Sequence, residues 1–423
     1  MLAAAPRDEE KPDRPRFHAV RFDRAKFQDQ ANLAGAVFGN RARFDAAIFG
    51  NEARFDGATF GDDALFGPLV SRGGLSLRWA TFGRNPGITI SAAALACQRM
   101  RLPEGARLNI RWAVIRLDGA TFSRPSMLAG SKSFGPRLDE AEAALRLELR
   151  HRPFWETDQP ELMVWRTSRP RLLSLQDTDV ANLTLSNVDL RACRFAGAHH
   201  LDQLRLEATI DLAGRPAGVR VGWALPPLWR WTRRRTLAEE QAWRRTRAKR
   251  SGWYPPACRP DDVADVSVDF EGAPQPAEIA LLYRALRKGR EDSKDEPGAA
   301  DFYYGEMEMR RHDPATPWPE RLVLALYWLV AGYGLRASRA LATLTLVLVG
   351  AAWLLVYQHG FADPQVMNLW GTLRYLARTA IGLPFEPQPA LTPRGEVLQI
   401  VVRVVAPVLL GLAALAIRAR IKR

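Results

Sequence analysis

Residues 16–66 read RFHAVRFDRAKFQDQANLAGAVFGNRARFDAAIFGNEARFDGATFGDDALF, and their spacing decides the fold. Large apolar residues recur at steps of five or six, and a small residue stands two positions before most of them. The large residues are Phe17, Phe22, Phe27, Leu33, Phe38, Phe44, Phe49, Phe55, Phe60 and Phe66. The small residues are Ala25, Ala31, Ala36, Ala42, Ala47, Ala53, Ala58 and Ala64.

Neither a helix, with its period of ~3.6 residues, nor a strand, with its period of two, produces this spacing. A solenoid that turns a corner every five residues does, because each large residue then stacks on its equivalent in the next coil. We therefore predict that the large residues form a buried structural ladder. The pairs Gly39-Asn40, Gly50-Asn51 and Gly61-Asp62 are expected at corners, since these residue types tolerate tight turns.

These units, such as ARFDG and AIFGN, resemble the pentapeptide-repeat family, whose pattern is A-(D/N)-(L/F)-x-x. The resemblance is clear to Phe66 and fades into echoes at 80–82 and 120–122. It implies a right-handed, four-sided β-helix, with bulged coils where a step takes six residues. A second block has five-residue steps at Leu175, Val180, Leu185, Leu190 and Phe195.

Charge along the repeats bears on one function of that family. Some members mimic DNA, which requires a strongly acidic surface. From residue 14 to residue 63 there are eight basic and seven acidic residues, so the surface is nearly neutral. This balance argues against DNA mimicry.

The composition of the whole chain sets further limits. Its 423 residues carry a formal charge of +14, and 47% are hydrophobic. With a mean hydropathy of −0.20, it is neither globally disordered nor mostly embedded in a membrane. The three cysteines, Cys97, Cys193 and Cys258, form no CxxC pair, which favours a reduced, cytoplasmic setting. The first 16 residues lack the apolar core of a secretory signal, so we expect a cytoplasmic N-terminus.

Residues 229–250, WRWTRRRTLAEEQAWRRTRAKR, hold nine basic and two acidic residues. Thr236 and Glu239 have the spacing of a capping box, which predicts that a helix begins there. Arginine mixed with tryptophan suits an anionic membrane surface, whereas nucleic acid and a solvated face remain alternatives. The residues expected to contact lipid are Arg230, Arg233, Arg234, Arg235, Arg244 and Arg245.

Two segments near the C-terminus are long and apolar enough to cross a membrane. Residues 340–357 carry no charge, and residues 397–417 carry one, Arg403. Basic residues lie before the first segment and after the second, so we expect a hairpin with both ends in the cytoplasm. Residues 322–335 are expected to form an interfacial helix. Arg403 is a candidate functional charge, although snorkelling or pairing with Glu396 is the simpler interpretation.

The loop 358–396 resembles the pore-helix segment of two-span cation channels. Such channels carry T-V-G-Y-G, where this chain has Thr379-Ala380-Ile381-Gly382-Leu383. We therefore expect a degenerate pore-like fold. Residues 276–423 as a whole resemble the C-terminal half of bacterial pentapeptide-repeat membrane proteins, on segments 282–311, 331–341 and 409–423.

Motifs of catalysis are missing from the sequence. There is no GxSxG, HExxH or Walker loop, and none of the six histidines has metal-ligand spacing. We predict a non-enzymatic protein with no catalytic residue, cofactor or metal.

The fold expected is mixed: a pentapeptide-repeat β-helix, then a helical juxtamembrane region and an α-helical two-span transmembrane hairpin. The predicted function is a scaffold in the cytoplasmic membrane that binds anionic inner-leaflet lipid and a cytoplasmic protein. The alternatives are a homo-oligomeric channel or transporter-like protein, and, less favoured, a tether for nucleic acid. The predicted segments are 1–15 (disordered lead-in), 16–135 (β-helix), 136–167 (connecting segment), 168–206 (second block), 207–275 (basic linker with a short helix), 276–335 (juxtamembrane helices), 340–357 (first span), 358–396 (external loop), 397–417 (second span) and 418–423 (basic tail).

Overall fold

The computed structural model describes most of the chain. It covers residues 15–18, 20–50, 52–131, 169–214, 219–221, 228–230, 234–247, 274–358, 360–362, 368–383 and 389–421. The predicted connecting segment 136–167 and all but the last residue of the predicted lead-in 1–15 lie outside the described residues. The chain divides into two compact units, 1–306 and 307–423.

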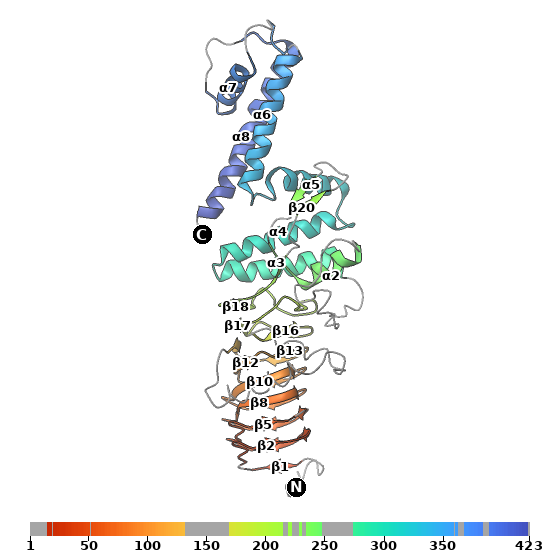
Figure 1. The fold of residues 1–423 in the computed structure, drawn as a ribbon, viewed down its shortest axis with the longest axis vertical. Helices are drawn as coiled ribbons and strands as arrows, with labels where there is room; N and C mark the ends of the chain where they lie inside the picture. The colour runs from red at the N-terminus through yellow and green to blue at the C-terminus, as the bar shows by residue number, and fades with distance from the viewer. Residues whose placement is uncertain are drawn as a thin grey trace. The chain divides into compact units, whose positions relative to one another are not determined.

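The first unit is a β-solenoid of short parallel strands, stacked along the red-to-yellow part of Figure 1. One sheet has the order β1 (Arg16–Phe17), β4 (Val37–Phe38), β7 (Thr59–Phe60), β9 (Thr81–Phe82), β11 (Arg101–Leu102) and β14 (Thr121–Phe122). The path of the second sheet is β18 (Arg205–Glu207), β17 (Leu183–Ser186), β15 (Ser126–Gly130), β12 (Arg107–Arg111), β10 (Gly87–Ala96), β8 (Leu65–Ser76), β5 (Ile48–Phe49) and β2 (Lys26–Phe27). Four strands pair beside that path: β3 (Ala31–Asn32), β6 (Ala53–Arg54), β13 (Val114–Arg116) and β16 (Arg171–Ser174).

Strand register gives the length of each coil. Val37 pairs with Thr59 and Thr59 with Thr81, so these coils take 22 residues. Arg101 pairs with Thr121, so the later coils take 20. Four sides with steps of five, six, five and six make 22, and four sides of five make 20. The step sizes of the ladder therefore specify a four-sided coil.

Coil length changes at two irregularities in the pairing of β8 with β10. The register shifts between Ile88 and Ile90 and again between Ala92 and Ala94. Each shift removes one residue from the coil. The coils that contain the six-residue steps pair at a constant 22 residues, so the bulges expected in them are not seen in their described strands, and the register shifts lie where the longer coils give way to the shorter ones.

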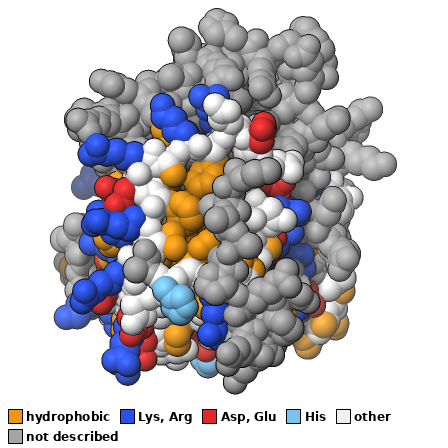
Figure 2. All heavy atoms as spheres, turned by 90° about the horizontal axis from the view of Figure 1, so that it is seen from below, with side chains coloured by type: hydrophobic (Ala, Val, Ile, Leu, Met, Phe, Trp, Pro, Cys, Tyr) orange, Lys and Arg blue, Asp and Glu red, His pale blue; other side chains and the backbone are white. Residues whose placement is uncertain are grey.

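The ladder residues form the core of the solenoid. From Leu33 to Phe66 every one of them is buried, and the alanines that precede them are buried as well. Phenylalanines of successive coils stack in parallel: the ring centroids of Phe38 and Phe60 are 4.9 Å apart, and those of Phe60 and Phe82 are 4.4 Å apart. Phe22 and Phe27 lie in the end coil and are only partly buried. Figure 2 looks onto this end, where hydrophobic side chains gather at the centre and charged ones at the rim.

The glycines of the three expected pairs, Gly39, Gly50 and Gly61, serve close approach more than turning, because none of them has a left-handed φ angle. A Cβ on Gly61 would lie 2.7 Å from the backbone nitrogen of Asn40 in the neighbouring coil, so only glycine fits. The left-handed φ angles fall on other residues, at Arg41, Asp63 and Asn85. Asn40 does take part in the corner, because its Oδ1 accepts a hydrogen bond of 2.9 Å from the backbone N–H of the residue after Gly61.

The two repeat blocks form one continuous solenoid. Met127 of β15 pairs with Thr184 of β17, 57 positions later, although Arg107 pairs with Met127 only 20 positions later. The excess of 37 over a 20-residue coil lies between Gly130, which pairs with Ile110, and Arg171, which pairs with Val114. One coil therefore carries an insertion between these two residues.

Helices cover the C-terminal end of the solenoid: α2 (Ala238–Arg247), α3 (Pro276–Asp292) and the first part of α4 (Glu296–His312). Lys288 of α3 forms an ion pair of 2.7 Å with Asp202. Two short antiparallel pairs join the solenoid to the helices, β19 (Ala213–Gly214) with β22 (Arg235–Thr236), and β20 (Val219–Val221) with β21 (Leu228–Arg230). A solenoid needs such a cap because its last coil has no neighbour to bury its face.

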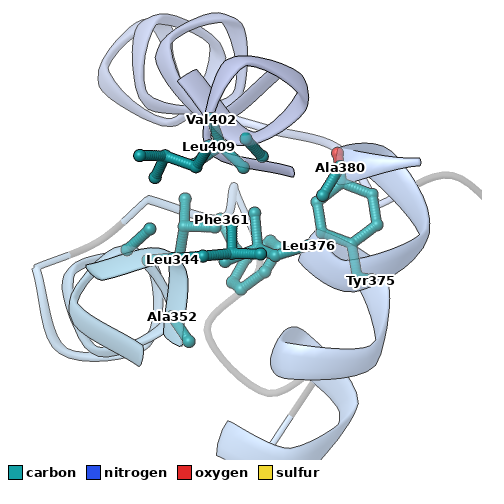
Figure 3. Close-up of a cluster of buried hydrophobic side chains, with 11 residues drawn as sticks. Leu344, Ala352, Phe361, Tyr375, Leu376, Ala380, Val402 and Leu409 are labelled. Atoms are coloured by element: carbon teal, nitrogen blue, oxygen red, sulfur yellow. The ribbon is translucent and has the colours of Figure 1, made fainter. Parts of the chain in front are cut away.

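The second unit is helical and contains the two candidate membrane spans. After the end of α4 come α5 (Trp318–Ala331), α6 (Ala337–Tyr357), α7 (Leu369–Ala380) and α8 (Pro393–Ile421). Helices α6, α7 and α8 enclose a cluster of buried apolar side chains, among them Leu344, Phe361, Leu376 and Val402 (Figure 3). Within the described residues, 337–357 and 393–418 are long and apolar enough to cross a membrane.

Candidate interaction surfaces

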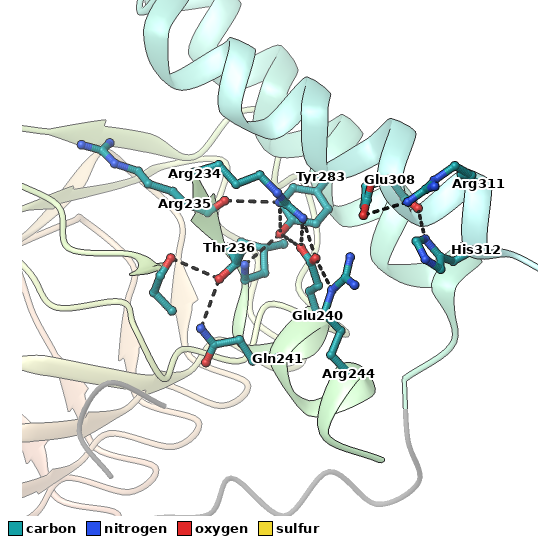
Figure 4. Close-up of polar contacts among 12 residues, drawn as sticks. Arg234, Arg235, Thr236, Glu240, Gln241, Arg244, Tyr283, Glu308, Arg311 and His312 are labelled. Carbon is teal, nitrogen blue, oxygen red and sulfur yellow. Dashed lines mark hydrogen bonds and ion pairs between the residues drawn. The ribbon is translucent and has the colours of Figure 1, made fainter. Parts of the chain in front are cut away.

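Part of the basic stretch forms a buried ion network within the cap of the solenoid (Figure 4). The guanidinium of Arg234 donates to both oxygens of Glu240, at 2.5 and 2.6 Å. Arg244 donates to the same carboxylate at 2.7 Å, and the hydroxyl of Tyr283 donates to it at 2.6 Å. Two cations and one phenol thus share one buried anion.

Two of the six arginines predicted to contact lipid, Arg234 and Arg244, are buried in this network instead. Arg234 is 5% exposed and Arg244 is 9% exposed, so neither side chain reaches a lipid surface. Arg235 is exposed and Arg245 is half-buried. The side chain of Arg230 and all of Arg233 lie outside the described residues. The sequence showed the excess of charge but not its partner in the cap.

Burial also fixes the protonation of the phenol in this network. Burial, together with the neighbouring Glu240 carboxylate, raises the pKa of Tyr283 well above its ordinary value. The hydroxyl therefore stays protonated and donates to Glu240, while its oxygen accepts the backbone N–H of Leu237 at 2.9 Å. The phenol ties α3 to the beginning of α2.

Glu239 closes the end of the solenoid. Its Oε1 accepts the backbone N–H groups of Phe195, at 2.5 Å, and Ala196, at 2.9 Å. Sequence spacing predicted a capping box with Thr236, but α2 begins at Ala238 and the Thr236 hydroxyl donates to the carbonyl of Ala213 instead. Burial raises the pKa of Glu239 above its ordinary 4.5, although the two N–H groups favour the ionised form.

One corner of the solenoid carries an exposed aromatic side chain that the sequence analysis did not select. Trp79 is 50% exposed and has a left-handed φ of 59°. The equivalent corners in two other coils are Gly57 and Gly119, both with a φ of 66°. In the next coil the same corner is Arg99, with a φ of 56°, so two large residues follow one another where the flanking coils have glycine, and this was the available signal.

Arginines surround this tryptophan. The guanidinium carbon of Arg99, in the next coil, lies 4.5 Å from the centre of the Trp79 ring. Arg78 is also exposed, and its Nε donates to the side chain of Gln98 at 3.3 Å. We call Arg78, Trp79 and Arg99 the corner patch. Tryptophan and arginine are the residue types most enriched at the centres of protein interfaces.

The candidate spans expose large apolar side chains. On α6 and α8 these include Leu346, Val349, Trp353, Val397, Ile400, Val401, Val404, Val408 and Leu415. Arg403 is exposed among the apolar side chains of α8. In the described part of the chain no ion pair joins it to Glu396. The basic side chain therefore lies on the outer face of α8.

Helix α7 has the place of a pore helix but ends differently. Asn368 caps its start by accepting the N–H of Gly371 at 2.8 Å. Its end turns back on itself, since the carbonyl of Arg378 accepts from Leu383 N and that of Thr379 accepts from Gly382 N. These two carbonyl groups are therefore engaged within the turn.

The described residues hold few groups suited to chemistry. No three His, Cys, Asp or Glu residues among them could hold a metal ion. Cys97 is buried, and burial raises the pKa of its thiol to about 12, which keeps it protonated and unreactive.

Comparison with known proteins places the repeats in a family. Residues 22–67 match the family described as pentapeptide repeats (9 copies). The chain carries a pentapeptide-repeat solenoid. No curated protein and no solved structure matches the chain.

Proposed function

We propose that this protein is a membrane-anchored, non-enzymatic scaffold whose pentapeptide-repeat solenoid binds a cytoplasmic protein. The observation that carries the anchor is the exposed apolar surface of α6 and α8. Each large apolar side chain left in water forgoes about 1.5–3 kcal/mol of transfer free energy. Lipid is the solvent that relieves this cost on two helices of spanning length.

The scaffold role is supported by the solenoid itself. Proteins with pentapeptide repeats are typically structural or interaction proteins. Here the interior is filled by stacked phenylalanines, which leaves the outer faces and corners for function. Rigid repeat arrays commonly bind partners on such extended surfaces.

The corner patch is the proposed site of protein binding. Trp79 offers an apolar plane, and the guanidinium groups of Arg78 and Arg99 favour carboxylates nearby. The partner should therefore present a segment with acidic and apolar side chains. Arg336 and Arg339, which lie at the start of α6, would keep that end of the span, and with it the solenoid, on the cytoplasmic side.

The anchor is tested by alkaline extraction of membranes from cells that express the full chain. We expect the protein to stay with the membrane pellet, and its release into the supernatant would overturn the anchor. Protease added to sealed inverted vesicles should digest the solenoid, whereas protection of the solenoid would reverse the proposed orientation.

The corner patch is tested by in-cell cross-linking followed by purification of the full chain. Wild type should yield one recurrent protein, and Trp79→Ala should lose it. The matched control is Leu65→Ala, which removes another exposed apolar side chain of the solenoid. Equal yields from wild type and both variants, or no recurrent partner at all, would contradict the proposal.

A pore-like activity is the second candidate, because α7 packs against both spans in a buried cluster that includes Leu355 and Val402. It would require several copies of the chain around one axis. Conductance of the protein reconstituted in planar bilayers would support it. Silence across a range of voltage and tension would exclude it.

A further inference from the structure

A sharp bend separates α5 from the first candidate span. Gly332, Tyr333 and Gly334 follow one another with left-handed φ angles of 54°, 58° and 74°. Such a run is rare for residues other than glycine, so the bend at Tyr333 is firmly imposed by its surroundings. Its hydroxyl donates to the buried carboxylate of Glu308 at 3.2 Å, which holds the bend against the end of α4.

The bend brings two arginines to one indole ring. The guanidinium carbon of Arg311 lies 4.5 Å from the centre of the Trp328 ring, and that of Arg339 lies 5.2 Å from it. Arg339 also donates to the backbone carbonyl of Trp328 at 3.1 Å. Three segments, the end of α4, α5 and the start of α6, thus meet at this indole.

The charges of the two arginines are balanced differently. Arg311 pairs with Glu308 at 3.1 Å, as Figure 4 shows. No carboxylate within the described ranges forms an ion pair with Arg339, whose side chain is half-exposed. Two further acids lie near: Glu320 is paired with Arg310 at 2.9 Å, and Asp313 accepts the backbone N–H of Ala315 at 3.0 Å. The cluster therefore keeps an uncompensated positive charge at the surface.

Helix α5 adds a large apolar surface beside this charge. Leu322, Val323, Leu326 and Leu329 are all exposed on it. Its buried contacts are made by Leu324 and Ala331. A helix with one buried face and one exposed apolar face, next to tryptophan and arginine, has the composition of a segment at a membrane interface.

We propose that Arg311, Trp328 and Arg339 bind the headgroup of an anionic phospholipid, with the exposed face of α5 in contact with its acyl chains. Arg339 supplies the charge for the phosphate, and the indole occupies the headgroup layer, where its ring and N–H are both satisfied. The inference rests on the proposed membrane anchor and names the lipid class that the anchor selects. A nucleic acid fits less well, because the apolar face of α5 has no role in binding it.

The test uses the purified full chain in detergent and its binding to vesicles of phosphatidylcholine, with or without one third phosphatidylglycerol. Wild type should prefer the anionic vesicles. Arg339→Gln should weaken binding to anionic vesicles about fivefold, since one cation near an anionic surface contributes ~1 kcal/mol. Arg339→Lys should keep most of the preference, and Arg374→Gln, which alters an exposed arginine of α7, should keep all of it.

Two outcomes would overturn the inference: equal binding to both kinds of vesicle, or equal losses for Arg339→Gln and Arg374→Gln. Inorganic phosphate at millimolar concentration separates the two sources of the anion. Competition by phosphate alone would indicate a site for the free ion, not for a lipid. A variant that elutes as aggregate would be replaced by Trp328→Phe, which should reduce the anionic preference while keeping an apolar ring.

The anchor and the headgroup site fail in different ways. Loss of the full chain from membranes under alkaline extraction would remove the anchor and this inference with it. Retention in membranes without a preference for phosphatidylglycerol would remove the headgroup site and leave the anchor intact.

Discussion

Truncation of one rung in the middle of the ladder should destabilise the solenoid far more than truncation at its open end. Phe44 is fully buried, and its ring lies within 6.2 Å of five other phenylalanine rings, at positions 22, 38, 55, 60 and 66. Phe22 belongs to the end coil and is only partly buried. The same Phe→Ala change therefore removes very different amounts of packing at the two positions.

For Phe44→Ala we expect a loss of about 3–5 kcal/mol in the free energy of unfolding, the range for fully buried phenylalanine. The neighbouring rings belong to coils held by backbone hydrogen bonds, so they cannot collapse into the cavity, which favours the upper half of the range. For Phe22→Ala, with fewer ring neighbours and existing exposure to water, we expect about half as much.

The assay is denaturant unfolding of the full chain in detergent, followed by protease susceptibility at sites within 20–131. Protease sites report on the solenoid alone, whereas circular dichroism would mix it with the helices. A solenoid can unfold in segments, so the midpoint of each site is compared with wild type separately. Equal losses for the two variants, or a loss below ~1 kcal/mol for Phe44→Ala, would refute the stacked-coil account.

Four further predictions concern other parts of the chain. Glu240→Ala should cost about 3–5 kcal/mol of stability in thermal unfolding, because it removes the buried carboxylate that pairs with two buried cations. Burial alone would raise the pKa of Asp189, but hydrogen bonds from Arg191 hold that pKa below 3.8 in the folded protein. The ionised carboxylate therefore stabilises the fold, and its contribution is complete above pH 3.8. This stability is lost as the pH falls through the lower pKa of the folded state. Unfolding of Asp189→Asn across pH 2–7 should lack this acid-side change and show lower stability at neutral pH. Arg403→Leu should favour membrane insertion of α8 by about 2.5–3.5 kcal/mol in a translocon assay, and no change would mean that Arg403 lies outside the apolar layer. Deletion of 132–168 should leave a 20-residue coil and an unfolding midpoint within a few degrees of wild type, and failure to fold would contradict the register.

The ladder could be predicted from sequence because its signal is local and repeated. Residues two and five positions apart are enough to specify a coil with one large and one small inward residue on each side. The 22-residue length of the first coils is also contained in the step sizes, but the change to 20 residues is not, because it occurs after the clear repeats end at Phe66. The corners were harder, since glycine was expected there for its φ angle and is required at Gly61 by the coil beneath it.

The burial of part of the basic stretch in the cap could not be predicted from composition. Arg234 and Arg244 look like surface charge until Glu240 and Tyr283, 43 residues apart, are brought together by the cap. A buried anion that accepts from three donors depends on tertiary contacts that no local pattern records. Glu239 was assigned to a capping box with Thr236 for the same reason, because its actual partners, the backbone N–H groups of residues 195 and 196, are distant in sequence.

The two sites proposed for function share one chemical device, an indole ring with arginine at its face, and differ in what surrounds it. At the corner patch, Trp79 lies on a solenoid whose exposed surface is polar, so its binding energy must come from a protein that covers the ring. At Trp328 the neighbouring helix is apolar and exposed over several residues, so lipid covers the ring without a partner. Added salt is therefore expected to affect binding at the two sites differently. Protein binding at the corner patch should weaken moderately as salt screens the arginines. Salt should also remove the preference for anionic lipid at Trp328, but the apolar contacts of α5 should keep the full chain on the membrane.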